Sequence, residues 1–225
     1  MAPRSNSSSN AKKQSPARAR GFVRGLDDTR ALLVAAARDV FLEHGPGNFS
    51  LREVARRVGV SAAAVYRHFD GKEALLFAAC TQGFQVFSGY LVRALAAATP
   101  RERMLAMSRQ YRAFALENPL DYRFIFMSVE TTAPLVHGGE VGACSSSALP
   151  QDTTFRFLVD RVKECVEAGV FAAGDPDNLA LLIWAHVHGV VSLRISGHLG
   201  AMGDDQAFAQ FFDASVERLL LGLSG

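Results

Sequence analysis

The chain of 225 residues has little of what marks metal-binding, secreted or membrane proteins. Its three cysteines, Cys80, Cys144 and Cys165, have no Cys-x-x-Cys spacing. We expect reduced thiols that pack in the interior, with a redox sensor as the rarer alternative. No apolar run approaches the roughly 20 residues of a membrane span. The polar, basic N-terminus lacks the apolar core of a signal peptide. We therefore predict a cytoplasmic protein with no membrane contact.

The short motifs of common catalytic sites are also missing. The sequence contains no Gly-rich phosphate loop, no nucleophile elbow and no His-Glu-x-x-His metal site. His186 and His188 point about 200° apart on a helix, so they cannot share one metal ion. We expect both to form hydrogen bonds in a core or pocket. These features predict a protein that is not an enzyme and that needs no metal or cofactor.

Alternation typical of strands is scarce, whereas helical periodicity covers most of the chain, and this predicts an all-α fold. Residues 131–150 hold Gly, Ser and Pro without periodicity, so we expect a long loop there. The helices expected after residue 71 cover residues 72–98, 101–117, 120–129, 152–168, 176–198 and 205–222.

Residues 29–75 have the pattern of three short helices separated by sharp turns. The first helix is amphipathic and ends at Gly45, where glycine can adopt the left-handed cap. Its apolar face comprises Leu33, Ala36, Ala37, Val40 and Phe41. Residues 46–48, Pro-Gly-Asn, then break the chain.

The segment 50–69 is predicted to form a helix, a tight turn and another helix. Ser50 and Glu53 have the Ser-x-x-Glu spacing of a capping box, and Gly59 permits the reversal because it lacks a Cβ. Ser61 is expected to cap the third helix. The side chains left outward are short or polar at their tips and suit close approach to bases and phosphates. They are Ser61, Ala62, Ala63, Tyr66 and Arg67.

Charge is divided unevenly along the chain. Residues 1–72 carry 13 Lys and Arg against six Asp and Glu, a net charge of +7, whereas residues 73–225 have a net charge of −5. Counterion release from a phosphate backbone requires such a basic region. The pattern therefore predicts DNA binding by the N-terminal third. The alternative is a three-helix module that is only structural, with solvated arginines.

Residues 1–26 are rich in Ser, Asn, Ala and Pro and carry six basic residues before the first acid. This composition predicts a disordered basic arm. Such an arm can add phosphate or minor-groove contacts, or it can serve only as a solubilising tail. The composition leaves both roles open.

The block from about Thr29 to Leu76 resembles the DNA-binding domain of TetR-type bacterial transcriptional regulators. The resemblance implies a helix-turn-helix domain over residues 27–72 and a helical-bundle domain for ligand binding and dimerisation over 73–225. The string from Val60 to Phe69, followed by Lys-Glu-Ala-Leu, is its most specific part. The matching residues are Ala37, Phe41, Gly45, Ser50, Ala55, Gly59, Val60, Ser61, Val65, Tyr66, Phe69, Lys72, Glu73 and Leu75.

The resemblance also implies which residues contact DNA. Those expected on the phosphate backbone are Ser50, Arg52, Tyr66, His68 and Lys72. Those expected to face bases are Ser61, Ala62, Ala63 and Arg67. Many relatives carry longer polar residues at positions 62 and 63. Alanine makes no bidentate hydrogen bond, so Arg67 and DNA shape are expected to supply much of the specificity.

The stretch from Trp184 to Gly189 resembles a TetR subgroup with a Trp-His-Gly signature in its penultimate helix. In the family, the last two long helices pack against their copies as a four-helix bundle. Helices 176–198 and 205–222 carry more apolar positions than one inward stripe needs, which fits a homodimer. The alternative is that both are core helices of a monomer.

Aromatic and methionine side chains are concentrated in the middle helices and indicate an apolar ligand cavity with a few polar groups. The sequence does not identify the ligand beyond a small lipophilic molecule. The residues expected to contact it are Phe87, Met107, Tyr111, Phe114, Phe124, Met127, Phe155, Trp184 and His188.

These patterns predict a homodimeric, ligand-responsive transcriptional regulator, most simply a repressor that a small-molecule effector releases from a palindromic operator in double-stranded DNA. One alternative is a helical-bundle ligand-binding protein or enzyme with a vestigial DNA-binding motif. A second is a non-specific DNA-coating protein that uses its basic arm. A third is an activator, because the sign of regulation depends on where the operator lies.

Overall fold

The computed structural model describes residues 26–128, 150–200 and 203–224, and the regular elements in these ranges are all helices. This confirms the all-α prediction. The loop expected at 131–150 lies outside the described residues except for Pro150, and the arm expected at 1–26 lies outside them except for Leu26.

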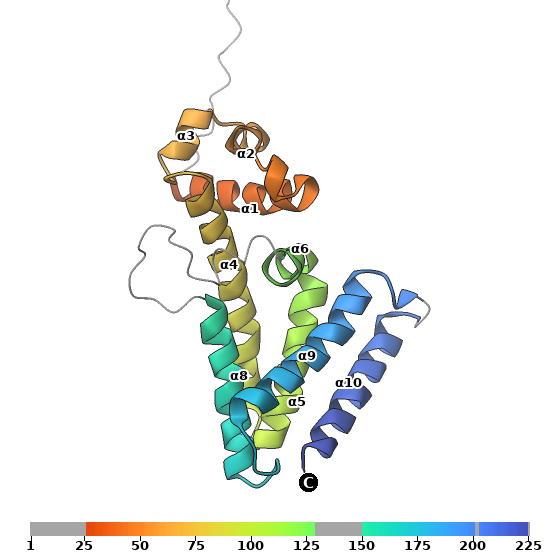
Figure 1. Cartoon of the computed structure of the whole chain (residues 1–225). Helices are drawn as coiled ribbons and strands as arrows, with labels where there is room; N and C mark the ends of the chain where they lie inside the picture. The colour runs from red at the N-terminus through yellow and green to blue at the C-terminus, as the bar shows by residue number, and fades with distance from the viewer. Residues whose placement is uncertain (1–25, 129–149, 201–202, 225) are drawn as a thin grey trace, which may run out of the picture.

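Three helices, one long and two short, form one end of the molecule (Figure 1). They are α1 (Leu26–His44), α2 (Leu51–Val58) and α3 (Ala62–Tyr66), with a 3-10 turn η1 (Pro46–Asn48) between the first two. Gly45 ends α1 with φ 72°, and its N–H donates to the Phe41 carbonyl over 2.8 Å. The stop signal predicted at Gly45 therefore acts where the sequence places it.

Helix α4 (Lys72–Val92) leads from the three-helix end deep into the rest of the molecule (Figure 1). It ends in a 3-10 turn η2 (Arg93–Ala96), so the expected single helix to residue 98 is shorter and tightens at its C-terminus. One face of α4 is buried along its length, from Leu75 through Phe84 and Phe87 to Leu91.

The remaining helices pack around the distal half of α4. Thr99 and Glu102 start α5 with a reciprocal capping box. The expected helix at 120–129 is a short α-helix that continues as a π-helix. The elements are α5 (Pro100–Glu117), α6 (Pro119–Tyr122), η3 (Arg123–Met127), α8 (Pro150–Glu167), α9 (Pro176–Ile195) and α10 (Asp205–Gly222).

Helices α9 and α10 lie side by side (Figure 1). Both leave large apolar side chains exposed. Leu181 and Leu182 of α9 are about half exposed, and Leu221 of α10 is 61% exposed. By length and composition, segments 72–96 and 176–195 could each cross a membrane, so the prediction that no apolar run is long enough was wrong. Core helices of soluble proteins pass the same test.

Helix α4 and η3 approach each other most closely at Gly83. This glycine is buried, and a Cβ built on it would lie 2.7 Å from Cγ2 of Ile125. Real Cβ atoms essentially never approach that closely, and Cγ2 is attached directly to Cβ, so it cannot swing away cheaply. The absence of a side chain at position 83 therefore sets the distance between α4 and η3.

We predict opposite effects for two alanine substitutions on α4. Gly83→Ala should lower the free energy of unfolding by about 1–3 kcal/mol, since the new methyl group overpacks against Ile125. Gly89→Ala meets nothing within 4 Å and should stabilise the protein by about 0.5–1 kcal/mol through helix propensity. Urea unfolding followed by circular dichroism measures both. Equal shifts in the two variants would contradict close packing at Gly83.

Candidate functional site

The turn between α2 and α3 is built as the sequence predicted. Gly59 adopts the left-handed conformation with φ 76°, and the next residue, Val60, donates its N–H to the Ala55 carbonyl over 3.0 Å. Ser61 then caps α3, because its hydroxyl accepts the N–H of Ala64 over 3.2 Å. The inner faces of both helices are buried with Phe69: Val54, Ala55, Ala64 and Val65.

The capping box predicted for α2 is absent. Ser50 occupies the N-cap position, but its side chain makes no capping hydrogen bond. Glu53 instead accepts hydrogen bonds from Arg56 over 2.8 and 2.6 Å and from Arg57 over 3.4 Å. Arg56 chiefly, together with Arg57, lowers the pKa of Glu53 to about 2. A carboxylate held by two guanidinium groups does not reach back to the Ser50 N–H.

The outward side chains of α3 and its flanks are the candidates for DNA contact. Ser61, Ala63 and Arg67 are exposed, Tyr66 is 61% exposed, and Ala62 is half-buried. This confirms that one face of the helix-turn-helix is free of the core. A DNA base could approach this face without displacing a side chain from the core.

The arginines of this region differ in how far their charge is already neutralised. Arg57 is hydrogen-bonded to both Glu43 and Glu53, and Arg56 is paired with Glu53. Arg52 and Arg67 are exposed and have no carboxylate within 4 Å in the described part of the chain. These two side chains are therefore the ones ready to meet phosphate or base edges.

Lys72 lies at the start of α4 and makes contacts that the sequence did not reveal. Its ammonium donates to the Pro46 carbonyl over 2.9 Å and lies 5.5 Å from the centre of the Phe49 ring. An ammonium carries three hydrogens, so two remain for other acceptors. Lys72 thus ties α4 to the segment between α1 and α2. His68, also expected at the DNA backbone, is half-buried.

Besides its packing on α4, helix α1 contacts α6 and η3 through two side chains. Arg38 donates to Asp121 of α6 over 2.7 Å. The ring of Phe41 meets that of Phe124 of η3 edge-on, with centres 5.4 Å apart. Phe124 was expected to contact a ligand, but it is buried at this junction instead. A change at α6 or η3 therefore acts directly on α1.

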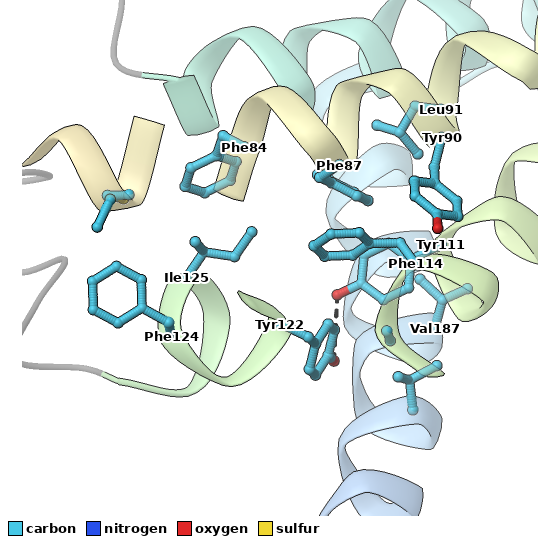
Figure 2. Close-up of a cluster of buried hydrophobic side chains, with 14 of the residues drawn as sticks. Phe84, Phe87, Tyr90, Leu91, Tyr111, Phe114, Tyr122, Phe124, Ile125 and Val187 are labelled. Carbon is cyan, nitrogen blue, oxygen red and sulfur yellow. Dashed lines mark hydrogen bonds between the residues drawn. The ribbon is translucent and has the colours of Figure 1, made fainter. Parts of the chain in front are cut away.

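A cavity of about 220 Å³ lies among α4, α5, η3, α8 and α9. Its described lining is almost entirely apolar. Figure 2 shows the aromatic cluster beside it, with Phe87 and Leu91 projecting from α4, Tyr111 from α5 and Val187 from α9. The lining residues are Phe87, Leu91, Met104, Met107, Ser108, Tyr111, Phe126, Thr154, Phe155, Leu158, Ile183, Trp184 and Val187.

Five of the nine expected ligand contacts line this cavity: Phe87, Met107, Tyr111, Phe155 and Trp184. Phe114 is fully buried behind it, packed on Phe87 and Tyr90 (Figure 2). Met127 is 36% exposed and borders a separate depression beside α1, together with Arg123. Phe114 and Met127, like Phe124, are therefore not part of the cavity lining. An aromatic or sulfur side chain in a middle helix is equally suited to core and cavity, so its type did not separate the two.

Sequence reasoning missed the aliphatic and small polar part of the lining. Leu91, Leu158, Ile183 and Val187 look like any core residue in a helical pattern, and Ser108 and Thr154 are short polar residues with no distinctive spacing. Only the crossing of α4, α5, α8 and α9 assigns them to a cavity.

A buried polar cluster adjoins the cavity at Tyr111. The hydroxyls of Tyr111 and Tyr122 each lie 3.0 Å from Nδ1 of His188 and 3.5 Å from each other. Burial raises the pKa of Tyr111 well above its usual value and lowers that of His188. His188, expected to contact a ligand, lies behind Tyr111 rather than in the lining.

The two histidines of α9 are hydrogen-bonded, as the sequence predicted. Nε2 of His186 lies 3.1 Å from the Ser215 hydroxyl of α10, while His188 faces the two tyrosines. Within the described ranges, no three His, Cys, Asp or Glu residues are grouped so that they could hold a metal ion.

Two family models match this chain, and together they cover most of it. The model described as "Bacterial regulatory proteins, tetR family" matches residues 33–79, which include the helix-turn-helix. The model described as "Tetracyclin repressor-like, C-terminal domain" matches residues 104–219, which include most of the cavity lining.

Similar proteins include known regulators and a solved structure. The chain is 23% identical to the HTH-type transcriptional regulator Rv1816 of Mycobacterium tuberculosis, over 78% of this chain and 84% of that protein. It is 31% identical to the HTH-type transcriptional activator FasR of Mycolicibacterium smegmatis, over 49% of this chain and 51% of that protein. A structure of a protein of unknown function from Rhodococcus sp. RHA1 superposes with a TM-score of 0.68 at 26% identity, covering 92% of this chain and all of that one.

We predict different consequences for the two serines at the helix starts. Ser61→Ala should lower the free energy of unfolding by about 1 kcal/mol, since it removes the oxygen that caps Ala64. Ser50→Ala should change it by less than about 0.5 kcal/mol, because that hydroxyl caps nothing. Urea unfolding of both variants distinguishes these outcomes. A larger loss of unfolding free energy from Ser50→Ala would indicate that the Ser50 hydroxyl caps α2.

Proposed function

Because the chain belongs to the TetR family of bacterial transcriptional regulators, we propose that it is a repressor that a small lipophilic ligand releases from a palindromic operator. The observation that carries this proposal is the course of α4. Its first residue, Lys72, is bonded to the helix-turn-helix end, and Phe87 and Leu91 of the same helix line the cavity. A continuous helix thus connects a DNA-binding face with a site for a small molecule.

The proposed DNA contacts divide into positioning and reading. Arg52 and Lys72 have hydrogens available for phosphate, and Ser50, Tyr66 and His68 flank the same face. Ser61, Ala62, Ala63 and Arg67 present the reading edge in the major groove. Since the two alanines offer only methyl contacts, Arg67 and the deformability of the operator supply much of the specificity. We assign this function to residues 27–72, and ligand binding and dimerisation to residues 73–225.

The proposed homodimer uses the exposed apolar face of α9 and α10. Leu181, Leu182 and Leu193 on α9, with Phe211 and Leu221 on α10, are each more than 40% exposed. Two copies of this face form a four-helix bundle that removes these side chains from water, with no need for a membrane. Two-fold symmetry then places two copies of α3 on half-sites about one DNA turn, or a multiple of it, apart.

Release follows from a shift between two arrangements of α4 and α1. A ligand in the cavity touches α4 at Phe87 and η3 at Phe126. The neighbouring η3 residue Phe124 packs on Phe41 of α1, so both routes lead to the DNA-binding end. To move the population from 1:99 to 99:1, the ligand must prefer the released arrangement by about 5.5 kcal/mol.

The C-terminal part also supports assignment to a Trp-His-Gly subgroup. Trp184 and His188 are one helical turn apart, with ring centres separated by 5.8 Å, and Gly189 follows directly. The residues of the signature thus meet at the polar cluster beside the cavity. A protein with this function works in the cytoplasm, where its DNA is.

Selection of bound sequences from random duplex DNA, with purified full-length protein at near-physiological salt, tests the proposal. We expect one palindrome. Recovery of random DNA would instead indicate a non-specific coating protein, and recovery of nothing would favour a vestigial motif. The position of the palindrome relative to its promoter distinguishes repression from activation. Activation is the activity named for FasR.

We predict that Arg52→Ala weakens binding to all sequences alike and flattens the slope of log affinity against log salt concentration by about one unit. The reason is the loss of one phosphate contact. Arg67→Ala should instead relax preference at particular base positions. Arg156→Ala on α8 is the control and should leave the slope unchanged. Titrations at several salt concentrations measure all three, and a base-specific loss from Arg52→Ala would contradict its role.

We predict that Leu182→Glu weakens dimerisation roughly tenfold or more, since it places unpaired carboxylates in the proposed interface. Leu95→Glu is a matched control, because Leu95 is 43% exposed on η2 and Leu182 is 47% exposed on α9. Sedimentation equilibrium of the parent and both variants measures the effect. Equal behaviour of the two variants would exclude this face as the interface.

A further inference from the structure

We propose that the cavity beside Tyr111 takes an uncharged molecule about the size of one substituted aromatic ring, with an oxygen that accepts the Tyr111 hydrogen. This inference rests on the proposed function, because it concerns the same effector site. It adds the charge, the size and the polar group of the effector.

The described lining of the cavity argues for an uncharged ligand. None of the described lining residues is Asp, Glu, Lys, Arg or His. A carboxylate, phosphate or ammonium group that entered the cavity would lose its hydrating water and find no oppositely charged side chain in the described lining. Burial of an unpaired charge is far more costly than burial of a neutral polar group. Nucleotides, acyl phosphates and simple carboxylic acids in their ionised forms are therefore poor candidates.

The volume limits the size of the ligand. The cavity measures about 220 Å³, whereas a dry protein cavity of roughly 150 Å³ holds benzene. One ring with a short substituent therefore fits without rearrangement. The rings of Phe87, Phe126, Phe155 and Trp184 line this space and favour a flat, polarisable partner.

The number of hydrogens in the polar cluster indicates which polar group the ligand carries. Nδ1 of His188 carries either one lone pair or one hydrogen, so it can accept from only one tyrosine. Both hydroxyls nevertheless lie 3.0 Å from it. The second phenolic hydrogen finds other acceptors in the cluster only at 3.5 Å, on the other tyrosine or on the His188 carbonyl.

Tyr111 is the tyrosine that faces the cavity. It is 4% exposed and lines the cavity, whereas Tyr122 is fully buried and does not. When Tyr122 donates to His188, the Tyr111 hydrogen is left with only the long 3.5 Å contact to the Tyr122 oxygen, so an acceptor in the cavity can compete for it. The Trp184 indole, which also lines the cavity, is a donor only and cannot take this hydrogen. A carbonyl, ether or hydroxyl oxygen of a ligand can.

Ser108, a small polar residue of the lining, does not compete with Tyr111 as a donor to the ligand. The Ser108 hydroxyl already donates to the Met104 carbonyl within its own helix, over 3.1 Å. Its hydrogen is used, and it serves as a control for a polar side chain in the same cavity.

Three probes of matched shape test the inference: acetophenone, α-methylstyrene and benzoate. The first has a carbonyl acceptor, the second replaces that oxygen with a methylene group, and the third is an anion. Trp184 is the single tryptophan of the chain, so one indole N–H resonance of the ¹⁵N-labelled full-length protein reports cavity occupancy. Titration of that resonance measures the affinity for each probe without DNA.

We expect acetophenone to bind most tightly. α-Methylstyrene should bind roughly three- to tenfold more weakly, as expected for one lost hydrogen bond. Benzoate should bind on the order of 100-fold more weakly or not at all, because its charge is unpaired. Tyr111→Phe should abolish the preference for acetophenone over α-methylstyrene, whereas Ser108→Ala should retain it.

Benzoate binding as tight as acetophenone would overturn the inference about charge. No response to any of the three probes would overturn the size and shape. A preference that survives Tyr111→Phe would overturn the role of that hydroxyl. A recovered operator with no probe binding would leave the proposed function standing and reject the ligand class. Probe binding without a recovered operator would support the ligand class and reject the proposed function.

Discussion

The close packing of α4 against both ends of the molecule is the constraint on which the other features depend. Lys72 attaches its N-terminus to the segment after α1, and Gly83 lets it approach Ile125 of η3 without an intervening side chain. One turn further on, Phe87 contributes to the cavity wall. Since a packed helix moves as a unit, a displacement at one of these points is felt at the others.

Electrostatics and aromatic packing have separate tasks in this architecture. Around α2, glutamates neutralise Arg56 and Arg57, which leaves Arg52 and Arg67 as unpaired cations at the exposed face of the described helix-turn-helix. Around the cavity, uncharged rings dominate, and the cluster of Tyr111, Tyr122 and His188 adds polar groups at one side. On the proposed function, charge serves contact with DNA, whereas the cavity selects its ligand by shape and by one hydrogen bond.

Local signals in the sequence predicted local structure well. The helix starts near residues 100, 150, 176 and 205, the left-handed Gly59 and the Ser61 cap are all found in the structure. The Ser50 capping box failed although its spacing is right, because Glu53 has two arginines as closer partners. Spacing shows that a contact is possible, but competition between partners decides whether it forms.

The sequence by itself determined the all-α class, the helix-turn-helix and the identity of the outward residues on α3. These depend on periodicity and caps, which act over a few neighbouring residues. Only the tertiary structure decided that Phe114 and Phe124 are core whereas Leu91 and Ile183 line a cavity, and that His188 lies behind Tyr111. A cavity is a property of how helices cross. Residues far apart in the chain must be placed before the space between them is defined.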